Sequence, residues 1–239
     1  MHPVILVLAA SGGLGASTFA AALAARVSSG GRAVLIDGDL HGGGIDSTAA
    51  IEHEPGLRWG DLGAVEGPVE GSRLIAALPA AGDVAVLSAG GDLRPSPSVI
   101  IEVISALAEQ AVVVIDGARG ALHPWVEVAD HLLLLVGTRP RRLRDGERLV
   151  RDLGRARGEA LIVTRGSRRA RAVGESVAAH LEIPWVDHVR DDPAVVRDEA
   201  RGRYPRPRGS LGEVVEATVD AFGLDLRARR EDLTGRRAS

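Results

Sequence analysis

The sequence predicts one α/β domain with a mostly parallel β-sheet and helices on both faces. Three observations support this fold class. Short apolar runs alternate along the chain with longer segments of helical periodicity. A glycine-rich turn joins the first apolar run to the first helical segment. Acidic residues directly follow two of the apolar runs, at the sheet edge where the carboxyl ends of parallel strands would meet.

Length and composition define the class of protein further. The 239 residues suffice for one α/β domain with a sizeable core. We expect this domain to span residues 1–223 and a polar, Arg-rich, flexible tail to span residues 224–239. The absence of cysteine excludes disulfides and is consistent with a cytoplasmic setting. The apolar run at residues 132–136 is far shorter than the ~20 residues of a membrane span, so no transmembrane segment is expected.

The order of elements follows from the periodicity. Seven buried strands are predicted, at residues 4–8, 33–36, 84–87, 111–116, 131–136, 160–163 and 185–189. Helices are predicted at residues 17–27, 72–78, 97–109, 141–157, 171–181 and 211–222, with another beginning at Pro193. Residues 54–62 appear as a loop-rich segment containing Trp59, which we expect to pack onto the core; the alternative is that this tryptophan anchors a partner.

The glycine-rich turn is the stretch A-A-S-G-G-L-G-A-S-T at residues 9–18. A strand, a glycine turn and a helix in this order are typical of a phosphate-binding loop. Glycine is needed there because backbone N–H groups must approach phosphate oxygens and φ can be positive. The hydroxyl groups of Ser17 and Thr18 could serve a metal ion and a phosphate.

The loop departs from the pattern G-x-x-x-x-G-K-[ST] at two defining positions. Ala16 stands in place of the lysine, and Ala10 stands in place of the first glycine. The chain contains no lysine at all, so all its basic residues are arginines. We therefore interpret the chain as a nucleotide-binding fold whose catalytic loop has decayed or been repurposed.

Carboxylates follow two strands. Asp37 and Asp39 come at the end of the second predicted strand, and Asp116 ends the run V-V-V-I-D. The latter pattern is typical of a Walker B element, whose acid holds the water shell of Mg²⁺. The alternative is an ordinary strand followed by a turn-starting acid. We favour the Walker B interpretation because the glycine loop accompanies it.

These motifs occur in an order that resembles the MinD/ParA P-loop ATPases over nearly the whole chain. The set comprises the glycine loop, D-G-D, V-V-V-I-D, L-L-L-V-G-T-R-P and D-D-P-A-V-V-R-D-E-A-R-G-R-Y-P. The run G-G-G-I-D followed by P-G-L-R-W-G-D-L is similar to the CpaE/TadZ branch, especially its actinobacterial CpaE-like (septum site-determining) members. Many members of that branch carry an N-terminal receiver-like domain, whereas this sequence begins at the P-loop domain. Both loop lysines of the family are replaced, by Ser11 and Ala16.

The resemblance implies ATP or ADP with Mg²⁺ as the ligand, and it implies a set of site residues. The nucleotide would contact Ser11, Gly12, Gly13, Leu14, Gly15, Ala16, Ser17, Thr18, Thr164 and Arg165, of which the last two stand where the family has an adenine-contacting Asn. The metal would be held by Ser17, Asp37, Asp39 and Asp116, and Asp39 would be catalytic if the protein is active. Two alternatives remain: the altered loop still binds nucleotide, or it is only a structural relic of a nucleotide-binding loop.

The resemblance further implies a localisation or scaffold protein for a Tad-type pilus or secretion apparatus, or for septum placement. Such a protein would be recruited to the pole or septum through protein partners and could dimerise. We expect weak or absent hydrolysis, because losing a transition-state cation costs ~10³ or more in rate. One alternative is an active ATPase in which Arg119 or Arg139 replaces the lysines.

A second alternative is a partitioning protein that binds DNA through arginine clusters at residues 139–144, 165–171 and 201–208. A net charge of −3 argues against it, because the molecule as a whole would not attract nucleic acid.

Overall fold

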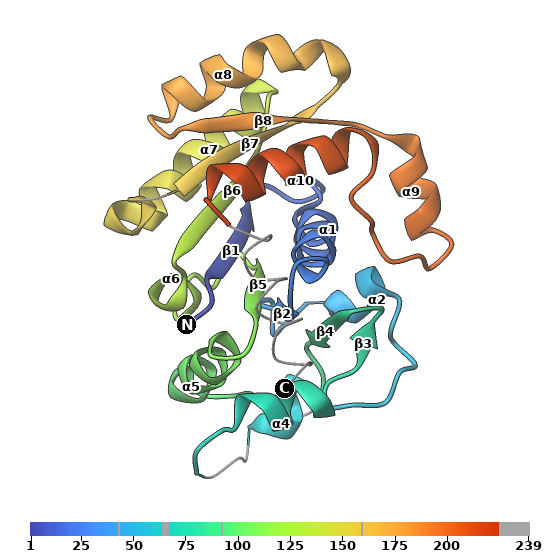
Figure 1. The fold of residues 1–239 in the computed structure, drawn as a ribbon. Coiled ribbons are helices and arrows are strands. Elements are labelled where there is room, and N and C mark those ends of the chain that lie inside the picture. The colour runs from blue at the N-terminus through green and yellow to red at the C-terminus, as the bar shows by residue number, and fades with distance from the viewer. Residues whose placement is uncertain (43, 64–66, 92, 159, 225–239) are drawn as a thin grey trace.

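The computed structural model describes residues 1–42, 44–63, 67–91, 93–158 and 160–224 (Figure 1). An eight-stranded sheet forms the centre, in the order β3-β4-β2-β5-β1-β6-β7-β8. All neighbouring strands are parallel except β3 and β4. The strands are β1 (Val4–Ala9), β2 (Ala33–Asp37), β3 (Ala80–Ala81), β4 (Val84–Leu87), β5 (Val112–Gly117), β6 (His131–Gly137), β7 (Ala160–Gly166) and β8 (Trp185–Arg190).

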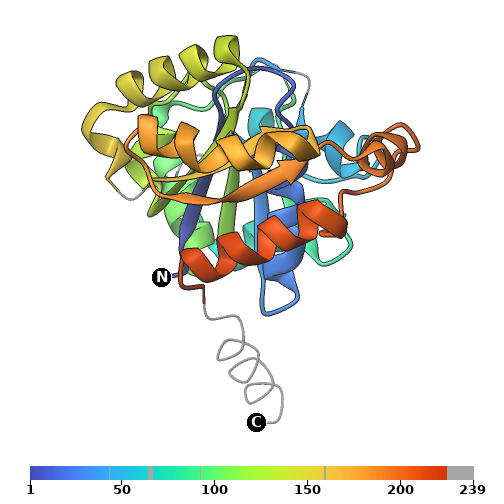
Figure 2. The ribbon, with the colours of Figure 1, turned by 90° about the horizontal axis from the view of Figure 1, so that it is seen from above.

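Helices cover both faces of this sheet (Figures 1 and 2). The helices α1 and α10 lie on one face, whereas α5, α7 and α8 lie on the other. The α-helices are α1 (Ala16–Ser28), α2 (Ile45–Ala49), α3 (Trp59–Leu62), α4 (Gly71–Ala77), α5 (Pro97–Ala108), α6 (Trp125–Val128), α7 (Pro140–Leu153), α8 (Arg171–His180), α9 (Pro193–Glu199) and α10 (Gly209–Ala221). Short 3-10 turns at Gly154–Arg157 and Arg168–Ala170 complete the described elements.

The helix α1 is buried on nearly every side because it lies between the sheet and α10. Phe19 and Leu23 fill the larger gaps, and the alanines between them allow close approach of the neighbouring backbones. An ion pair between Arg26 and Glu216 joins α1 to α10. The Tyr204 hydroxyl also donates to the Ala21 carbonyl at 2.8 Å, which fixes the segment before α10 against α1.

The seven predicted strands are confirmed, and their ends agree to within a few residues. The strand β3 was not predicted, since a two-residue antiparallel pairing leaves no periodicity to detect. The short helices α2, α3 and α6 were not predicted either. The predicted helix at 141–157 is α-helical only to Leu153, because Gly154 takes a positive φ of 53° and a 3-10 turn follows.

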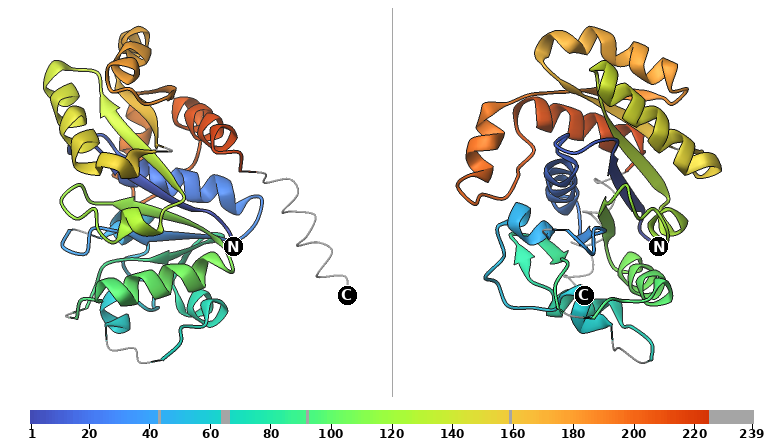
Figure 3. Two further views of the ribbon diagram at one scale, coloured as in Figure 1. Left: turned by 90° about the vertical axis from the view of Figure 1, so that its left-hand side faces the viewer. Right: turned by 180° about the vertical axis from the view of Figure 1, so that it is seen from behind.

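The helix α9 stands outside the two helical layers, and it buries none of its residues (Figures 1 and 3). Leu224 is buried against the core, so ordered packing reaches at least that residue. The remainder of the predicted tail, residues 225–239, lies outside the described residues. Among the described helices, none combines the length and apolar character that crossing a membrane requires.

Candidate functional site

The glycine loop lies between the central strand β1 and the N-terminus of α1, as predicted. Gly13 and Gly15 both have positive φ, of 70° and 77°. The backbone N–H groups of residues 11–18 donate to no acceptor within the described part of the chain. Eight consecutive amide donors at a helix N-terminus form a cradle suited to an anion.

A hydroxyl group at the start of this loop is also unsatisfied. The Ser11 Oγ atom is buried and has no hydrogen-bond partner among the described residues. Such an orphaned polar atom is costly unless a ligand or solvent engages it. Ser11 therefore adds a further polar group that an oxygen-rich ligand could satisfy.

Ser17 and Asp116 meet across the first turn of α1. The Ser17 hydroxyl lies close enough to the Asp116 carboxylate to lower its pKa. Burial raises the pKa of Asp116 to about 7, and the nearby charges of Asp37 and Asp39 raise it further against the opposing effect of Ser17. Of the four residues predicted to serve the metal, Ser17, Asp37 and Asp39 thus lie close enough to Asp116 to shift its pKa.

Asp37 is the most heavily engaged of these carboxylates. One oxygen accepts from the Asp39 amide at 3.0 Å, and the other accepts from the amides of Ile45 and Ala89 at 2.8 and 3.2 Å. Burial raises its pKa, and these backbone donors counteract the shift. Asp37 therefore ties the segment leading to α2 and the loop after β4 to the end of β2.

Asp39 is exposed by contrast and accepts from the His41 amide at 3.2 Å. No group of three or more histidine, aspartate or glutamate side chains in the described ranges is arranged to hold a metal ion. A site made of protein ligands alone is thus not formed there. Mg²⁺ usually takes only one or two carboxylates and completes its shell with water and phosphate oxygens. Ser17 and Asp116 would fit that smaller role.

Thr164 and Arg165, adjacent on β7, face opposite sides of the sheet. Thr164 is fully buried, and its hydroxyl lies 3.0 Å from His188 Nδ1 and accepts from Trp185 Nε1 at 3.2 Å. The structure therefore does not bring Thr164 to the loop. Arg165 does reach the loop and donates to the Leu14 carbonyl at 2.9 Å.

Of the two arginines considered as replacements for lysine, only Arg119 is hydrogen-bonded to the loop. Arg119 donates to the Ala10 carbonyl at 2.6 Å. Arg139 is exposed at the N-terminus of α7 and has no hydrogen bond to the loop. The position of Arg165 was missed as a cation source, because the sequence suggested only that it contacts adenine.

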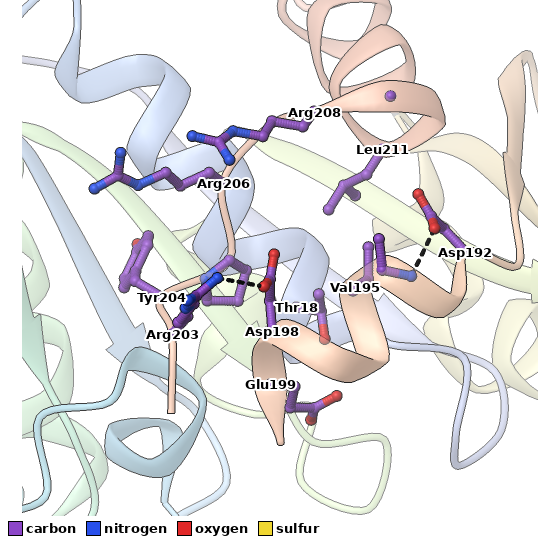
Figure 4. Close-up of a pocket in the computed structure, with 13 residues that line it drawn as sticks. Thr18, Asp192, Val195, Asp198, Glu199, Arg203, Tyr204, Arg206, Arg208 and Leu211 are labelled. Carbon is purple, nitrogen blue, oxygen red and sulfur yellow. Dashed lines mark hydrogen bonds and ion pairs between the residues drawn. The ribbon is translucent and has the colours of Figure 1, made fainter. Parts of the chain in front are cut away.

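A pocket of about 480 Å³ opens beside the loop, between α1 and the segment from β8 to α10 (Figure 4). Thr18 provides its wall on the loop side. In Figure 4, Arg206 and Arg208 lie toward one end and Asp192 toward the other. Its lining is Thr18, Asp192, Ala194, Val195, Asp198, Glu199, Arg203, Tyr204, Pro205, Arg206, Arg208, Gly209 and Leu211. Sequence reasoning missed this pocket, although it had noted the run D-D-P-A-V-V-R-D-E-A-R-G-R-Y-P that forms most of it.

Trp59 packs in the core beside the end of β2, where it contacts the backbone of Asp37. Its side chain is 1% exposed, its Nε1 donates to the Asp37 carbonyl at 2.9 Å, and its ring packs edge-on against Trp125. The predicted packing of Trp59 onto the core is confirmed. A residue so deeply buried cannot anchor a partner on the surface.

No protein-family model matches the chain. Two uncharacterized proteins from different strains of Mycobacterium tuberculosis are each 44% identical over 85 residues, which is 36% of this chain and 23% of the relative. The match therefore spans less than a quarter of each relative's length.

Solved structures match nearly the whole chain. The MinD cell division protein of Aquifex aeolicus has a TM-score of 0.73 at 17% identity, covering 92% of this chain and 97% of its own. A ParA family ATPase of Chlorobium tepidum has a TM-score of 0.73 at 15% identity, covering 92% and 98%. The septum site-determining protein MinD of Pyrococcus horikoshii, solved with Mg-ADP, has a TM-score of 0.67 at 17% identity, covering 94% and 96%. The chain has the fold of the MinD/ParA-like P-loop NTPases.

Proposed function

We propose that this protein binds a purine nucleoside di- or triphosphate with Mg²⁺ and acts as a nucleotide-dependent scaffold with little or no turnover. The observation that carries the proposal is the run of amide groups from Ser11 to Thr18, at the N-terminus of α1, that have no acceptor among the described residues. The helix dipole and these donors favour negative charge at this point. The structure of the MinD homologue from Pyrococcus horikoshii with Mg-ADP supports the choice of ligand.

The pocket beside the loop has room for a nucleoside. It begins at Thr18, directly behind the amide cradle, so a ligand could place its phosphates on the loop and its base in the pocket. Val195 and Leu211 supply apolar surface there, whereas Arg206 and Arg208 supply donors. The lining also includes the carboxylates of Asp192, Asp198 and Glu199, so polar groups of both charges surround the apolar surface.

Weak hydrolysis follows from the missing charge. Phosphoryl transfer depends on positioning and on neutralising the charge that develops on the phosphate. Ala16 places no cation in the first turn of α1, and Asp116 with its pKa near 7 is only partly ionised at neutral pH. Mg²⁺, when bound, would supply part of the missing charge beside Ser17 and Asp116. The backbone amide groups of the loop can hold the phosphates of a bound nucleotide. They do not neutralise the charge that develops during phosphoryl transfer, so binding is affected less than hydrolysis.

The cellular role that we propose is of the CpaE/TadZ kind. The protein would help to place a Tad-type pilus or secretion apparatus, or the septum, through contacts with protein partners and through dimerisation. Support comes from the shared fold and from the solved complex of MinD with MinC from Aquifex aeolicus, in which a protein of this fold binds a protein partner. Nucleotide occupancy would then control the contact surface rather than drive repeated turnover.

Titration calorimetry with ATP and ADP, with and without Mg²⁺, tests this proposal, together with a long-incubation phosphate-release assay. We expect saturable, Mg²⁺-dependent binding and phosphate release near background. Ser17→Ala should weaken the Mg²⁺-dependent component, because it removes the hydroxyl that contacts Asp116. Ser176→Ala, on the exposed face of α8, is the matched control. Absence of binding at millimolar nucleotide would refute the proposal.

A second candidate function, nucleic-acid binding, is favoured by one observation on α7. Arg141, Arg144, Arg148 and Arg151 are all exposed and follow the 3-4-3 spacing that places them in one row along the helix. None of them forms an ion pair with any residue that the structure describes. A row of unpaired guanidinium groups suits the regularly spaced phosphates of a nucleic-acid backbone.

Fluorescence anisotropy with a labelled DNA duplex over a range of salt concentrations tests this second candidate. Binding should weaken steeply with salt, and the double variant R144Q/R148Q should lower both the affinity and the salt slope. The control R32Q/R197Q removes the same charge from exposed positions elsewhere. Equal behaviour of the two double variants would exclude α7 as the contact surface.

A further inference from the structure

Two arginines approach the glycine loop from opposite sides. Arg119 follows β5, which pairs with one edge of β1, whereas Arg165 belongs to β7, beyond β6 on the other side. Their Nη1 atoms donate to the carbonyls of Ala10 and Leu14, at 2.6 and 2.9 Å. These carbonyls lie at the start and in the middle of the loop, so the two guanidinium groups are held at separate points along it.

The fit between Arg165 and Gly15 is close. A Cβ atom on Gly15 would collide with Arg165 Nη1, so the guanidinium occupies the space that the missing side chain leaves free. The Arg165 side chain is only 17% exposed, and its Nε lies 3.5 Å from the Asp191 carboxylate. A guanidinium in such a place keeps its charge, because arginine does not lose its proton in proteins.

Three carboxylates lie beside this loop, and a nearby positive charge would stabilise them in their ionised form. Asp37, Asp39 and Asp116 lie near one another beside it, and the chain has no lysine to balance them. Within the described ranges, Arg119 and Arg165 are the arginines whose side chains are hydrogen-bonded to loop carbonyls. Each guanidinium has more N–H donors than these contacts use, and the free donors are suited to bidentate contact with phosphate oxygens.

We propose that Arg119 and Arg165 together supply positive charge for binding the phosphates, in place of the two absent loop lysines, whereas position 16 at the start of α1 still holds no cation for catalysis. The inference rests on the proposed nucleotide function and deepens it by assigning the cations of the site. It departs from the expectation for Arg139, whose exposed side chain makes no hydrogen bond to the loop. The competing explanation is that both arginines only brace the loop backbone.

The two explanations differ in how binding depends on the number of phosphates. Cations that contact phosphate add more to the affinity for ATP than for ADP or AMP, and nothing to the affinity for adenosine. The loss of a backbone brace would lower the thermal stability of the protein together with the ATP affinity, whereas the loss of a phosphate contact would lower the ATP affinity alone. We therefore compare the dissociation constants of adenosine, AMP, ADP and ATP for the wild type, Arg119→Gln, Arg165→Gln and the double variant. Thermal unfolding and far-UV circular dichroism check that each variant folds.

We expect each single variant to bind ATP roughly 10- to 100-fold more weakly than the wild type, with a smaller loss for ADP and AMP. Arg165→Lys, which keeps the charge without the planar fork, should restore part of the affinity. Arg139→Gln is the matched control and should bind ATP as the wild type does, because Arg139 is exposed and makes no hydrogen bond to the loop. If the variants bind ATP as well as Arg139→Gln does, or lose adenosine as strongly as ATP, the inference is wrong.

A parallel titration with inorganic tripolyphosphate separates this inference from the proposed function. Wild-type binding of ATP, with no special loss in the two arginine variants, would leave the nucleotide function standing and overturn the inference. If the wild type binds tripolyphosphate but not ATP, and the two arginine variants lose that binding, the inference about the arginines stands and the proposed nucleotide function is overturned. Binding of neither ligand by the wild type would overturn both.

Discussion

Asp37 and Asp116 are register partners at the carboxyl ends of the adjacent parallel strands β2 and β5. The Gly38 amide, next to Asp37, donates to the Asp116 carbonyl at 2.8 Å and so holds the carboxyl ends of β2 and β5 side by side. Two buried or half-buried carboxylates are thus held side by side by backbone pairing. Their pKa values are both raised, and burial is the largest cause in each case. This arrangement makes the stability of the fold depend on pH.

The first prediction concerns Asp116→Asn. The pKa of Asp116 rises from 3.8 to about 7 on folding, so the native state holds its proton to higher pH than the unfolded chain does. The free energy of unfolding should therefore fall between about pH 4 and pH 7, by at most about 1.4 kcal/mol per pH unit from this group. In Asp116→Asn the free energy of unfolding should fall less steeply with pH than in the wild type. The pH dependence that remains should come from Asp37, whose pKa is also raised.

Urea unfolding at several pH values from 4.5 to 8 measures this effect. Asp83→Asn, at an exposed position after β3, is the control and should follow the wild type. Unchanged pH dependence in Asp116→Asn would contradict the assigned shift. The same proton should also oppose Mg²⁺-nucleotide binding, so that affinity rises as the pH increases through 7.

The second prediction compares Asp37→Asn with Asp39→Asn. Asp37 accepts three backbone N–H groups in a buried setting, and the asparagine NH₂ group cannot accept in place of the lost oxygen. We expect a loss of about 2–4 kcal/mol in the free energy of unfolding. Asp39 is exposed, so its variant should change stability by less than about 0.5 kcal/mol. Denaturant titration distinguishes the two, and similar values for both would disprove the structural role of Asp37.

The third prediction uses two glycines of the same loop. Gly15→Ala forces a residue with a side chain into a φ of 77° and displaces the Arg165 guanidinium. We expect a cost of about 1–2 kcal/mol and a loss of ATP affinity. Gly12 has no atom within 4 Å of a built Cβ and no positive φ, so Gly12→Ala should change stability little. Thermal unfolding and ATP titration test the pair, and equal effects would argue against the close fit at Gly15.

The fourth prediction restores a lysine. Ala16→Lys places an ammonium group in the first turn of α1, beside the cradle and the three aspartates. It should strengthen ATP binding by about tenfold or more and raise phosphate release above background, because it adds charge where the transferred phosphate develops it. Ala77→Lys, exposed at the end of α4, adds the same charge elsewhere. If Ala16→Lys and Ala77→Lys show the same ATP affinity and the same rate of phosphate release, the missing charge at position 16 does not limit nucleotide binding or hydrolysis.

Several features of the fold were predictable because each is local. Buried strands such as β1 and β6 are continuous apolar runs, which a parallel sheet covered on both faces requires. The loop at residues 11–18 was predictable because positive φ at Gly13 and Gly15 demands glycine. The meeting of Asp37 and Asp116 followed from the rule that parallel strands end at the same edge.

The remaining features depend on contacts between distant segments. Thr164 and Arg165 are neighbours in sequence, and only the packing of β7 against α8 on one side and the loop on the other decided which of them faces the loop. The pocket needs Thr18 beside residues 192–211, which no local pattern can place.

The sequence by itself determined the α/β class, the phosphate-type loop and the absence of every lysine, because these follow from residue types and short-range periodicity. Tertiary structure alone decided which arginines reach the loop. An arginine side chain is long, and its direction depends on the strand that carries it and on the groups that hold its guanidinium. Arg119 and Arg165 are held at Ala10 and Leu14 by strand order and backbone carbonyls, whereas Arg139 remains exposed.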